Sequence, residues 1–204
     1  MYVRTIYMTG DPAQLDDVAE SVRSEGRELL SGQRGYRGMG VFVDRTVGKL
    51  LVGSWWEDEA SRQASEEALR ARRTEMFAPF SRTGAIDNWE AAVARRREDV
   101  GPGATFRLAR LDVEPAGIDR LVTTFRETAL PKVEAIPGMK GVSLLVDRAH
   151  GRAAVGTLYA DRAALDASRS TVTAIRDEAT AKAGVVTRSL EEFDVLVATA
   201  VPHT

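Results

Sequence analysis

The chain of 204 residues has no cysteine and only two histidines. Without cysteine, disulfide bonds, thiolate metal sites and cysteine nucleophiles are excluded. The histidines are His150, in a short loop, and His203, next to the C-terminal residue, so neither lies on a predicted helix. A basic excess is also missing, since the formal net charge is -2, and this argues against a nucleic-acid partner.

Long apolar runs are absent as well. No stretch approaches the roughly 20 apolar residues of a membrane-spanning helix, and the N-terminal sequence MYVRTIYMTGD lacks the pattern of a signal peptide. We therefore expect a cytoplasmic protein with no membrane partner. The hydrophobic fraction of 44% suffices for one sizeable core or two small ones.

The chain contains an internal repeat. VDRTVGKLLVGSWW at 43–56 and VDRAHGRAAVGTLY at 146–159 are identical at six of fourteen positions. With the same offset of 103 residues, 35–65 and 138–168 share twelve of 31 positions, whereas chance gives roughly two. The sequence thus predicts a duplicated unit of about 95 residues, with a first repeat at 1–95, a linker at 96–103 and a second repeat at 104–204.

Each copy predicts the element order strand, helix, strand, strand, helix, strand. The hairpin loops contain Gly48 and Gly151, suited to the positive φ of a tight turn. Asp58 and Asp161 stand at the expected N-caps of the second helices. This order, βαββαβ, is the ferredoxin-like unit, so the fold class is α+β with two such units in tandem. Pro131 should kink or split the first helix of the second copy.

The middle strands indicate how the copies combine. Residues 41–43 and 144–146 are apolar on both faces, whereas a lone ferredoxin-like sheet, open on one face, should alternate. We therefore expect the two antiparallel sheets to lie face to face, as a pseudo-dimeric α+β barrel within one chain. A monomer would then complete the barrel, and further self-association stays open.

The sequence resembles the dimeric α+β barrel superfamily and, within it, the antibiotic biosynthesis monooxygenase-like family. The resemblance rests on the unit length, a third strand that ends in tryptophan, and the following WEDEASRQAS, answered by YADRAALDAS. It implies cofactor-independent oxidation of a small planar aromatic compound. A haem-degrading branch implies a helix histidine, an asparagine and a tryptophan. Trp56 matches the tryptophan and Asn88 is the only asparagine, but the helix histidine is lacking.

Aromatic side chains are the candidate ligand-binding residues. In a sheet-helix pocket they would stack a planar ligand, whereas the alternative is that they only fill the core. Trp55 and Trp56 should point to opposite faces of their strand. Copy one is richer in aromatics, yet the small residues of copy two would also leave a cavity, and the sequence does not choose between them. The candidates are Trp55, Trp56, Phe42, Phe77, Phe80 and Tyr159.

Three residues are the candidate catalytic groups. Arg4 and Arg107 hold equivalent strand positions and would stabilise a developing negative charge on the substrate. Tyr7 would donate a hydrogen bond. The alternative for the arginines is a structural role, at the sheet edge or in an ion pair.

Three classes of function remain open at this point. The first is an enzyme that oxidises an aromatic compound, and we expect no metal or other cofactor for it. The second is a non-catalytic module that binds a small hydrophobic ligand, including haem. The third is a unit that serves only structure and self-association.

Overall fold

The computed structural model describes residues 1–96 and 98–201. By its internal contacts the chain divides into two units. Unit 1 comprises Met1–Trp89, Asp99–Pro102 and Phe193–Val201. Within the described residues, unit 2 comprises Glu90–Glu98 and Gly103–Glu192. The ends of the last strands of the two sequence repeats therefore belong to the other unit.

The elements of the first copy follow the predicted order. They are β1 (Tyr2–Gly10), α1 (Pro12–Ser21), a π-helical segment (Val22–Gly26), α2 (Arg27–Ser31), β2 (Tyr36–Asp44), β3 (Lys49–Trp56), α3 (Glu59–Phe77) and β4 (Ser81–Arg95).

The second copy repeats this order. Its elements are β5 (Thr105–Asp112), a short 3-10 turn (Pro115–Gly117), α4 (Ile118–Thr124), a π-helical segment (Phe125–Ala129), α5 (Leu130–Glu134), β6 (Met139–Asp147), β7 (Arg152–Tyr159), α6 (Arg162–Ala167), α7 (Arg169–Ala183) and β8 (Val186–Ala198).

All recorded strand pairs are antiparallel. In unit 1, β3 lies between β1 and β2, and the end of β8 pairs with β2 from Gly40↔Ala198 to Val43↔Asp194. In unit 2, β7 lies between β5 and β6, and the end of β4 pairs with β6. The hydrogen-bonded order β1-β3-β2-β8-β5-β7-β6-β4 closes into a barrel. The predicted fold class, two ferredoxin-like units in a barrel within one chain, is confirmed.

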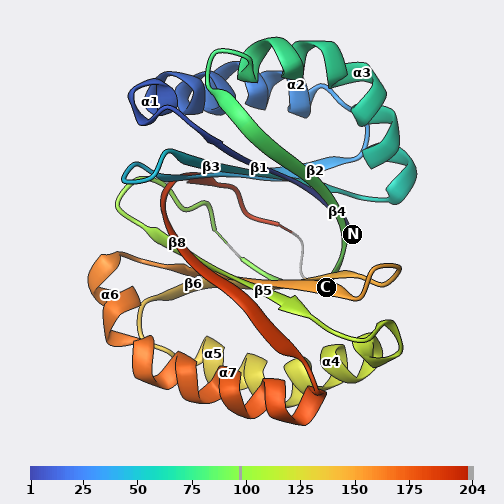
Figure 1. Ribbon diagram of the computed structural model, residues 1–204, viewed down its shortest axis with the longest axis vertical. Coiled ribbons are helices and arrows are strands. Elements are labelled where there is room, and N and C mark those ends of the chain that lie inside the picture. The colour runs from blue at the N-terminus through green and yellow to red at the C-terminus, as the bar shows by residue number, and fades with distance from the viewer. Residues whose placement is uncertain (97, 202–204) are drawn as a thin grey trace. The chain divides into compact units, whose positions relative to one another are not determined.

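Each unit has its helices on one face of its sheet (Figure 1). In unit 1, α1 contributes Leu15 and Val18 to the core, which pack with Val41, Leu50 and other side chains from the same sheet face. In unit 2, α4 and α7 supply the equivalent apolar face. The 3.6-residue periodicity of these helices selects one apolar stripe, and that stripe is the one buried.

The first helical region of both copies is split in the same way. A π-helical segment spans Val22–Gly26 in copy one and Phe125–Ala129 in copy two, and the two are equivalent by the offset of 103 residues. Pro131 follows the second segment, as expected for a split helix, but copy one is split without a proline. The proline is therefore not needed for the split. Such π segments are often found at functional sites.

The predicted caps and turns are confirmed. The side chain of Asp58 accepts a hydrogen bond from Ser61 N at 2.7 Å, and Asp161 caps the second copy's helix in the same way. Gly48 and Gly151 have φ values of 63° and 62°. A Cβ at Gly48 would lie 2.4 Å from the carbonyl oxygen of Gly10, so the turn requires glycine.

The substitutions Gly48→Ala and Gly151→Ala should each destabilise the fold by about 1–3 kcal/mol, because both the positive φ and the contact with the opposing carbonyl oppose a Cβ. Gly101→Ala is the control, since Gly101 has no positive φ and nothing within 4 Å of its virtual Cβ. Urea unfolding of the three variants measures the difference. Equal stability of all three would contradict the assignment.

An isolated first repeat, residues 1–98, should aggregate or self-associate. It lacks Phe193–Val201, which belong to unit 1 and pair with β2, so an apolar strand edge is left without its neighbour. Light scattering and thermal melts check this. The control is the full chain cut between Pro102 and Gly103, which keeps every strand and should stay monodisperse. A monomeric isolated repeat with an unchanged melting temperature would refute the prediction.

Candidate functional site

Unit 1 contains a cavity between its sheet and its helices, with a volume of about 60 Å³. Strands β1 and β3 form its floor, and the π-helical segment, α2 and α3 form its walls. Nearly all of the lining is apolar, apart from two arginines and one serine. The lining residues are Arg4, Ile6, Val22, Gly26, Leu29, Leu30, Val52, Ser54, Leu69, Arg73, Met76 and Phe77.

Unit 2 contains the equivalent cavity, with a volume of about 70 Å³. Its floor is formed by β5 and β7 and its walls by the second π-helical segment, α4, α5, α7 and one residue of β8. The lining residues are Arg107, Ala109, Leu111, Leu121, Phe125, Ala129, Val133, Val155, Thr157, Val172, Ile175, Arg176, Ala179, Thr180 and Leu190.

The polar groups of the two cavities correspond. The offset of 103 residues relates Arg4 to Arg107 on the first strand of each copy, and Ser54 to Thr157 on the third. It also relates Arg73 on α3 to Arg176 on α7. Each cavity thus has one arginine at its floor and one on its helical wall. Neither copy alone holds the site, because both hold one.

The floor arginine of unit 1 is deeply buried. Arg4 is 3% exposed, and burial lowers its pKa to about 10. Its guanidinium donates to the carbonyl oxygen of Arg62 and to Ser65 Oγ, and its Nε lies 3.0 Å from Glu66 Oε2. Glu66 also accepts from Arg73, at 2.9 Å from Nη1. One carboxylate on α3 therefore pairs with both cavity arginines of copy one.

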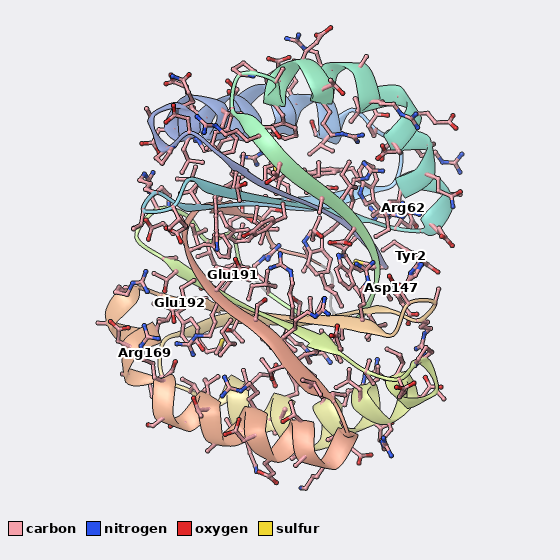
Figure 2. All side chains as sticks on the ribbon, viewed as in Figure 1. Tyr2, Arg62, Asp147, Arg169, Glu191 and Glu192 are labelled. Atoms are coloured by element: carbon pink, nitrogen blue, oxygen red, sulfur yellow. The ribbon has the colours of Figure 1, made fainter. Side chains whose placement is uncertain are left out.

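Copy two neutralises its floor arginine from another element. Arg107 is paired with Glu192 of β8, with Nη2 3.2 Å from Oε1. Glu192 is shared with Arg162 and Arg169, each at 2.7 Å; Figure 2 labels Arg169 and Glu192. Arg169 stands where copy one has Glu66. The acid thus comes from the helix in copy one and from the last strand in copy two.

An aromatic ring lies beside each floor arginine. The guanidinium carbon of Arg4 is 5.8 Å from the ring centroid of Trp56, and that of Arg107 is 5.6 Å from the ring of Tyr159. Trp56 Nε1 donates to Ser54 Oγ at 3.0 Å. The hydroxyl of Tyr159 is buried and finds no partner among the described residues. The cation–π contact offsets part of the desolvation of each arginine.

The predicted site residues divide between the two faces of the sheet. Arg4, Arg107 and Phe77 line the cavities, whereas Trp56, Tyr159 and Phe80 are buried on the same side without lining them. Since Val52 and Ser54 face the cavity, strand alternation places Trp55 on the opposite face, as predicted for adjacent tryptophans.

Phe42 and Tyr7 also belong to that opposite face. Phe42 is opposite Leu51 across the β2–β3 pair, and Tyr7 lies between Ile6, which lines the cavity, and the core residue Met8. The ring of Tyr7 lies 6.0 Å from Lys49 Nζ. A hydrogen bond from Tyr7 to a ligand would therefore act on the face away from the cavity, and it stays a prediction.

Sequence reasoning missed four charged residues of the sites: Arg73, Arg176, Glu66 and Glu192. A signal was present for the arginines, because Arg73 and Arg176 keep the same offset of 103 residues. No such signal existed for the two acids, since they occupy non-equivalent positions.

The residues present do not fit haem. His150 lies in the β6–β7 turn with its side chain 72% exposed and paired with Asp147, and His203 is outside the described residues. Asn88 accepts a hydrogen bond from Arg62 Nη1 at 2.6 Å and is held by it. In the part of the chain that is described, no group of three or more histidine, aspartate or glutamate side chains is arranged to hold a metal ion.

Comparison with known proteins agrees with this architecture. Residues 1–74 match the family model described as antibiotic biosynthesis monooxygenase. The first copy carries an antibiotic biosynthesis monooxygenase domain. The resemblance inferred from the sequence is thereby confirmed, while the substrate is not shown by it.

Relatives over nearly the whole chain come from Mycobacterium tuberculosis H37Rv. The uncharacterized protein Rv2557 is 27% identical over 198 residues, covering 97% of this chain and 88% of the relative. The uncharacterized protein Rv2558 is 25% identical over 199 residues, covering 97% and 84%. Both alignments therefore span the two copies of this chain.

Two solved structures show the same fold. An inferred monooxygenase from Lactobacillus acidophilus NCFM has a TM-score of 0.75 at 11% identity and covers 100% of this chain and 98% of its own. An anthrone oxidase-like protein has a TM-score of 0.67 at 14% identity, covering 100% and 92%. At these identities the likeness concerns the fold alone.

Within the described residues, no helix is long and apolar enough to cross a membrane.

The variant Glu66→Gln should lose about 1–3 kcal/mol of stability at neutral pH, because Arg4 then keeps its buried charge without a carboxylate. Hydrogen bonds from Arg73 and the charge of Arg4 outweigh partial burial and hold the pKa of Glu66 below its ordinary 4.5. A lowered carboxyl pKa stabilises the fold above pH 4.5, and this stabilisation is lost as the pH falls through the folded-state pKa.

The difference between wild type and Glu66→Gln should therefore shrink as the pH is lowered below about 4.5. Urea unfolding across that range measures it. The control Glu20→Gln removes a fully exposed carboxylate whose pKa is also lowered, by Arg23, and should change neutral-pH stability little. A constant difference at all pH values would show that Glu66 acts by packing instead of charge.

Proposed function

We propose that the chain binds a small planar aromatic compound in its sheet-helix cavities and oxidises it with O2 without a cofactor. The observation that carries the proposal is the duplicated cavity, with a buried arginine at the floor of each copy and apolar walls. Such a cavity favours a flat apolar ligand that carries or develops one negative charge. The monooxygenase domain at residues 1–74 supports the same chemistry.

The arginines would stabilise negative charge on the substrate and would not transfer protons. Arg4 and Arg107 are buried hydrogen-bond donors with a positive charge, so each can stabilise the enolate or phenolate of a bound substrate. The ionised ring passes an electron to O2, and the resulting radical pair combines to form a carbon–oxygen bond. For a substrate of the anthrone type, the ring carbon loses two hydrogens and gains one ketone oxygen, and the other oxygen atom leaves as water.

Cavity size limits the substrate. Volumes of about 60 and 70 Å³ are below the roughly 300–1,000 Å³ of typical small-molecule sites. A cavity that holds benzene has a volume of roughly 150 Å³, so even a single ring requires the lining side chains to move, and a larger ring system requires a larger movement. In unit 1 those side chains are Met76, which is unbranched, and Phe77, which is the last residue of α3. The π-helical wall of each cavity gives a second place where the backbone can adjust.

A second candidate function is ligand binding without catalysis. Among the described residues that line either cavity there is no histidine and no carboxylate, so neither lining supplies a general base. Oxidation would then depend on a substrate that ionises readily by itself. A ligand that does not ionise would be bound and released unchanged.

Anthrone and O2 test the proposal, since one fold relative is described as anthrone oxidase-like. We expect the wild type to speed O2 consumption and anthraquinone formation. The double variant Arg4→Met/Arg107→Met should lose roughly 10²-fold of the rate, the usual effect of removing such a donor. The single variants should divide the activity between the two cavities.

The matched control is Arg23→Met, which removes an exposed arginine paired with Glu20 and should leave the rate unchanged. Circular dichroism checks that each variant is folded. If anthrone binds but is not oxidised above the buffer rate, the binding function replaces the oxidative one for this substrate. If the double variant is as fast as wild type, the arginines have no part in the reaction.

A further inference from the structure

The two cavities differ in the charge that remains at their helical wall. In unit 1, Glu66 bonds to Arg73 through both oxygens and to Arg4, so the two arginines that line this cavity share one carboxylate. In unit 2, the position equivalent to Glu66 is Arg169, which is turned to Glu192 and Asp166 instead. The helical wall of the second cavity therefore has no counterpart of Glu66.

Arg176 is left with a weak partner. Among the residues that the structure describes, Asp177 is the carboxylate that pairs with it, at 3.1 Å. Asp177 is the next residue along the chain and its side chain is 65% exposed, whereas that of Arg176 is 23% exposed. An ion pair with such an exposed neighbour contributes little. A ligand carboxylate at the cavity could bind the same guanidinium through two hydrogen bonds.

The walls of the second cavity also favour access from the surface. Ala179 and Thr180 stand where the first cavity has Met76 and Phe77. Leu190 of β8 lines the cavity and is still 48% exposed, so apolar surface continues to its mouth. At the position of Val22 the second cavity has the larger Phe125, and the two volumes are similar. Ala179 and Thr180 lie three and four residues after Arg176 on α7, and they are smaller than Met76 and Phe77. They therefore leave more room on the helix face of Arg176 than the first cavity has beside Arg73.

We propose that the cavity of unit 2 binds a small aromatic carboxylate and that the cavity of unit 1 does not. The ring packs against Val172, Ile175 and Leu190, and the carboxylate pairs with Arg176. The inference rests on the proposed function in placing the ligand between sheet and helices, and it specifies an acidic ligand for one of the two sites.

Benzoate and benzamide are a matched pair of probes, since they have the same ring and differ in charge. The chain has five isoleucines, of which Ile6 lines the first cavity and Ile175 the second. Isoleucine methyl NMR therefore reports each cavity separately. We expect benzoate to shift the Ile175 methyl with saturation and to leave Ile6 unmoved, and we expect benzamide to bind at least about tenfold more weakly.

Variants make the test specific to Arg176. Arg176→Gln should weaken the binding of benzoate by about tenfold or more and leave the affinity for benzamide unchanged. The equivalent substitution Arg73→Gln should leave both affinities, measured at the Ile175 methyl, unchanged. Thr180→Phe gives the second cavity the side chain of the first and should block benzoate. Because the readout is binding, the result is independent of whether anthrone is oxidised.

Four outcomes would overturn the proposal. They are a saturable shift of Ile6 as strong as that of Ile175, equal affinity for benzoate and benzamide, unchanged benzoate affinity in Arg176→Gln, and no shift of Ile175 up to the solubility limit. Loss of benzoate binding in Arg176→Gln together with an intact methyl spectrum supports it, because a misfolded variant would move all five signals.

Discussion

A buried guanidinium on the first strand of each copy constrains the rest of the site. Arg4 and Arg107 are 3% and 7% exposed, and a charge so far from water requires a carboxylate, hydrogen bonds and a polarisable neighbour. Each copy supplies all three, with an aromatic ring beside the guanidinium and an acid within 3.2 Å. The cavity is the apolar space that this arrangement leaves between sheet and helices.

Three linked differences between the copies follow from where the acid is placed. Copy one has Glu66 on α3, and the helix also buries Arg62, which is held by Asn88 of β4. In the last strands the offset is 104 residues, as the pairs Glu90↔Val146 and Val43↔Asp194 show. Copy two therefore has Glu192 on β8 at the position of Asn88, with Arg169 at the position of Glu66 and Leu165 at that of Arg62. Replacing the acid on the helix by arginine would, alone, leave the buried floor arginine without a carboxylate. In copy two the glutamate on β8 supplies that carboxylate.

Much of the fold followed from the sequence because its signals are local and repeated. The offset of 103 residues, the turn glycines at positive φ and the N-cap aspartates all depend on backbone geometry within a few residues. The exchange of the last strands was not visible. It depends on which sheet edge receives residues 90–95 and 193–198, and both strands would look the same if each paired within its own repeat.

The site was predicted unevenly for the same reason. Arg4 and Arg107 are predictable because both copies keep an arginine on a strand that is otherwise mostly apolar. Arg73 and Arg176 keep the same offset, but they lie on helices rich in charge, where one more arginine does not stand out. Aromatic content drew attention to Trp55 and Phe42, which strand alternation places on the face away from the cavity. Apolar side chains look alike on either face of a sheet that is apolar on both, so composition alone does not locate the cavity.

The duplication lets one chain hold two sites that no longer have to be alike. In a symmetric pair of identical chains, any substitution that alters one cavity alters the other. Here the acid that neutralises the helical wall of the first cavity is absent from the second, while both floor arginines remain paired. The charge balance around Arg4 and Arg107 is thus kept in both copies because the fold requires it, whereas the charge balance around Arg73 and Arg176 differs between the copies. Selectivity between ligands of different charge can therefore arise at the wall without disturbing the core on which both units depend.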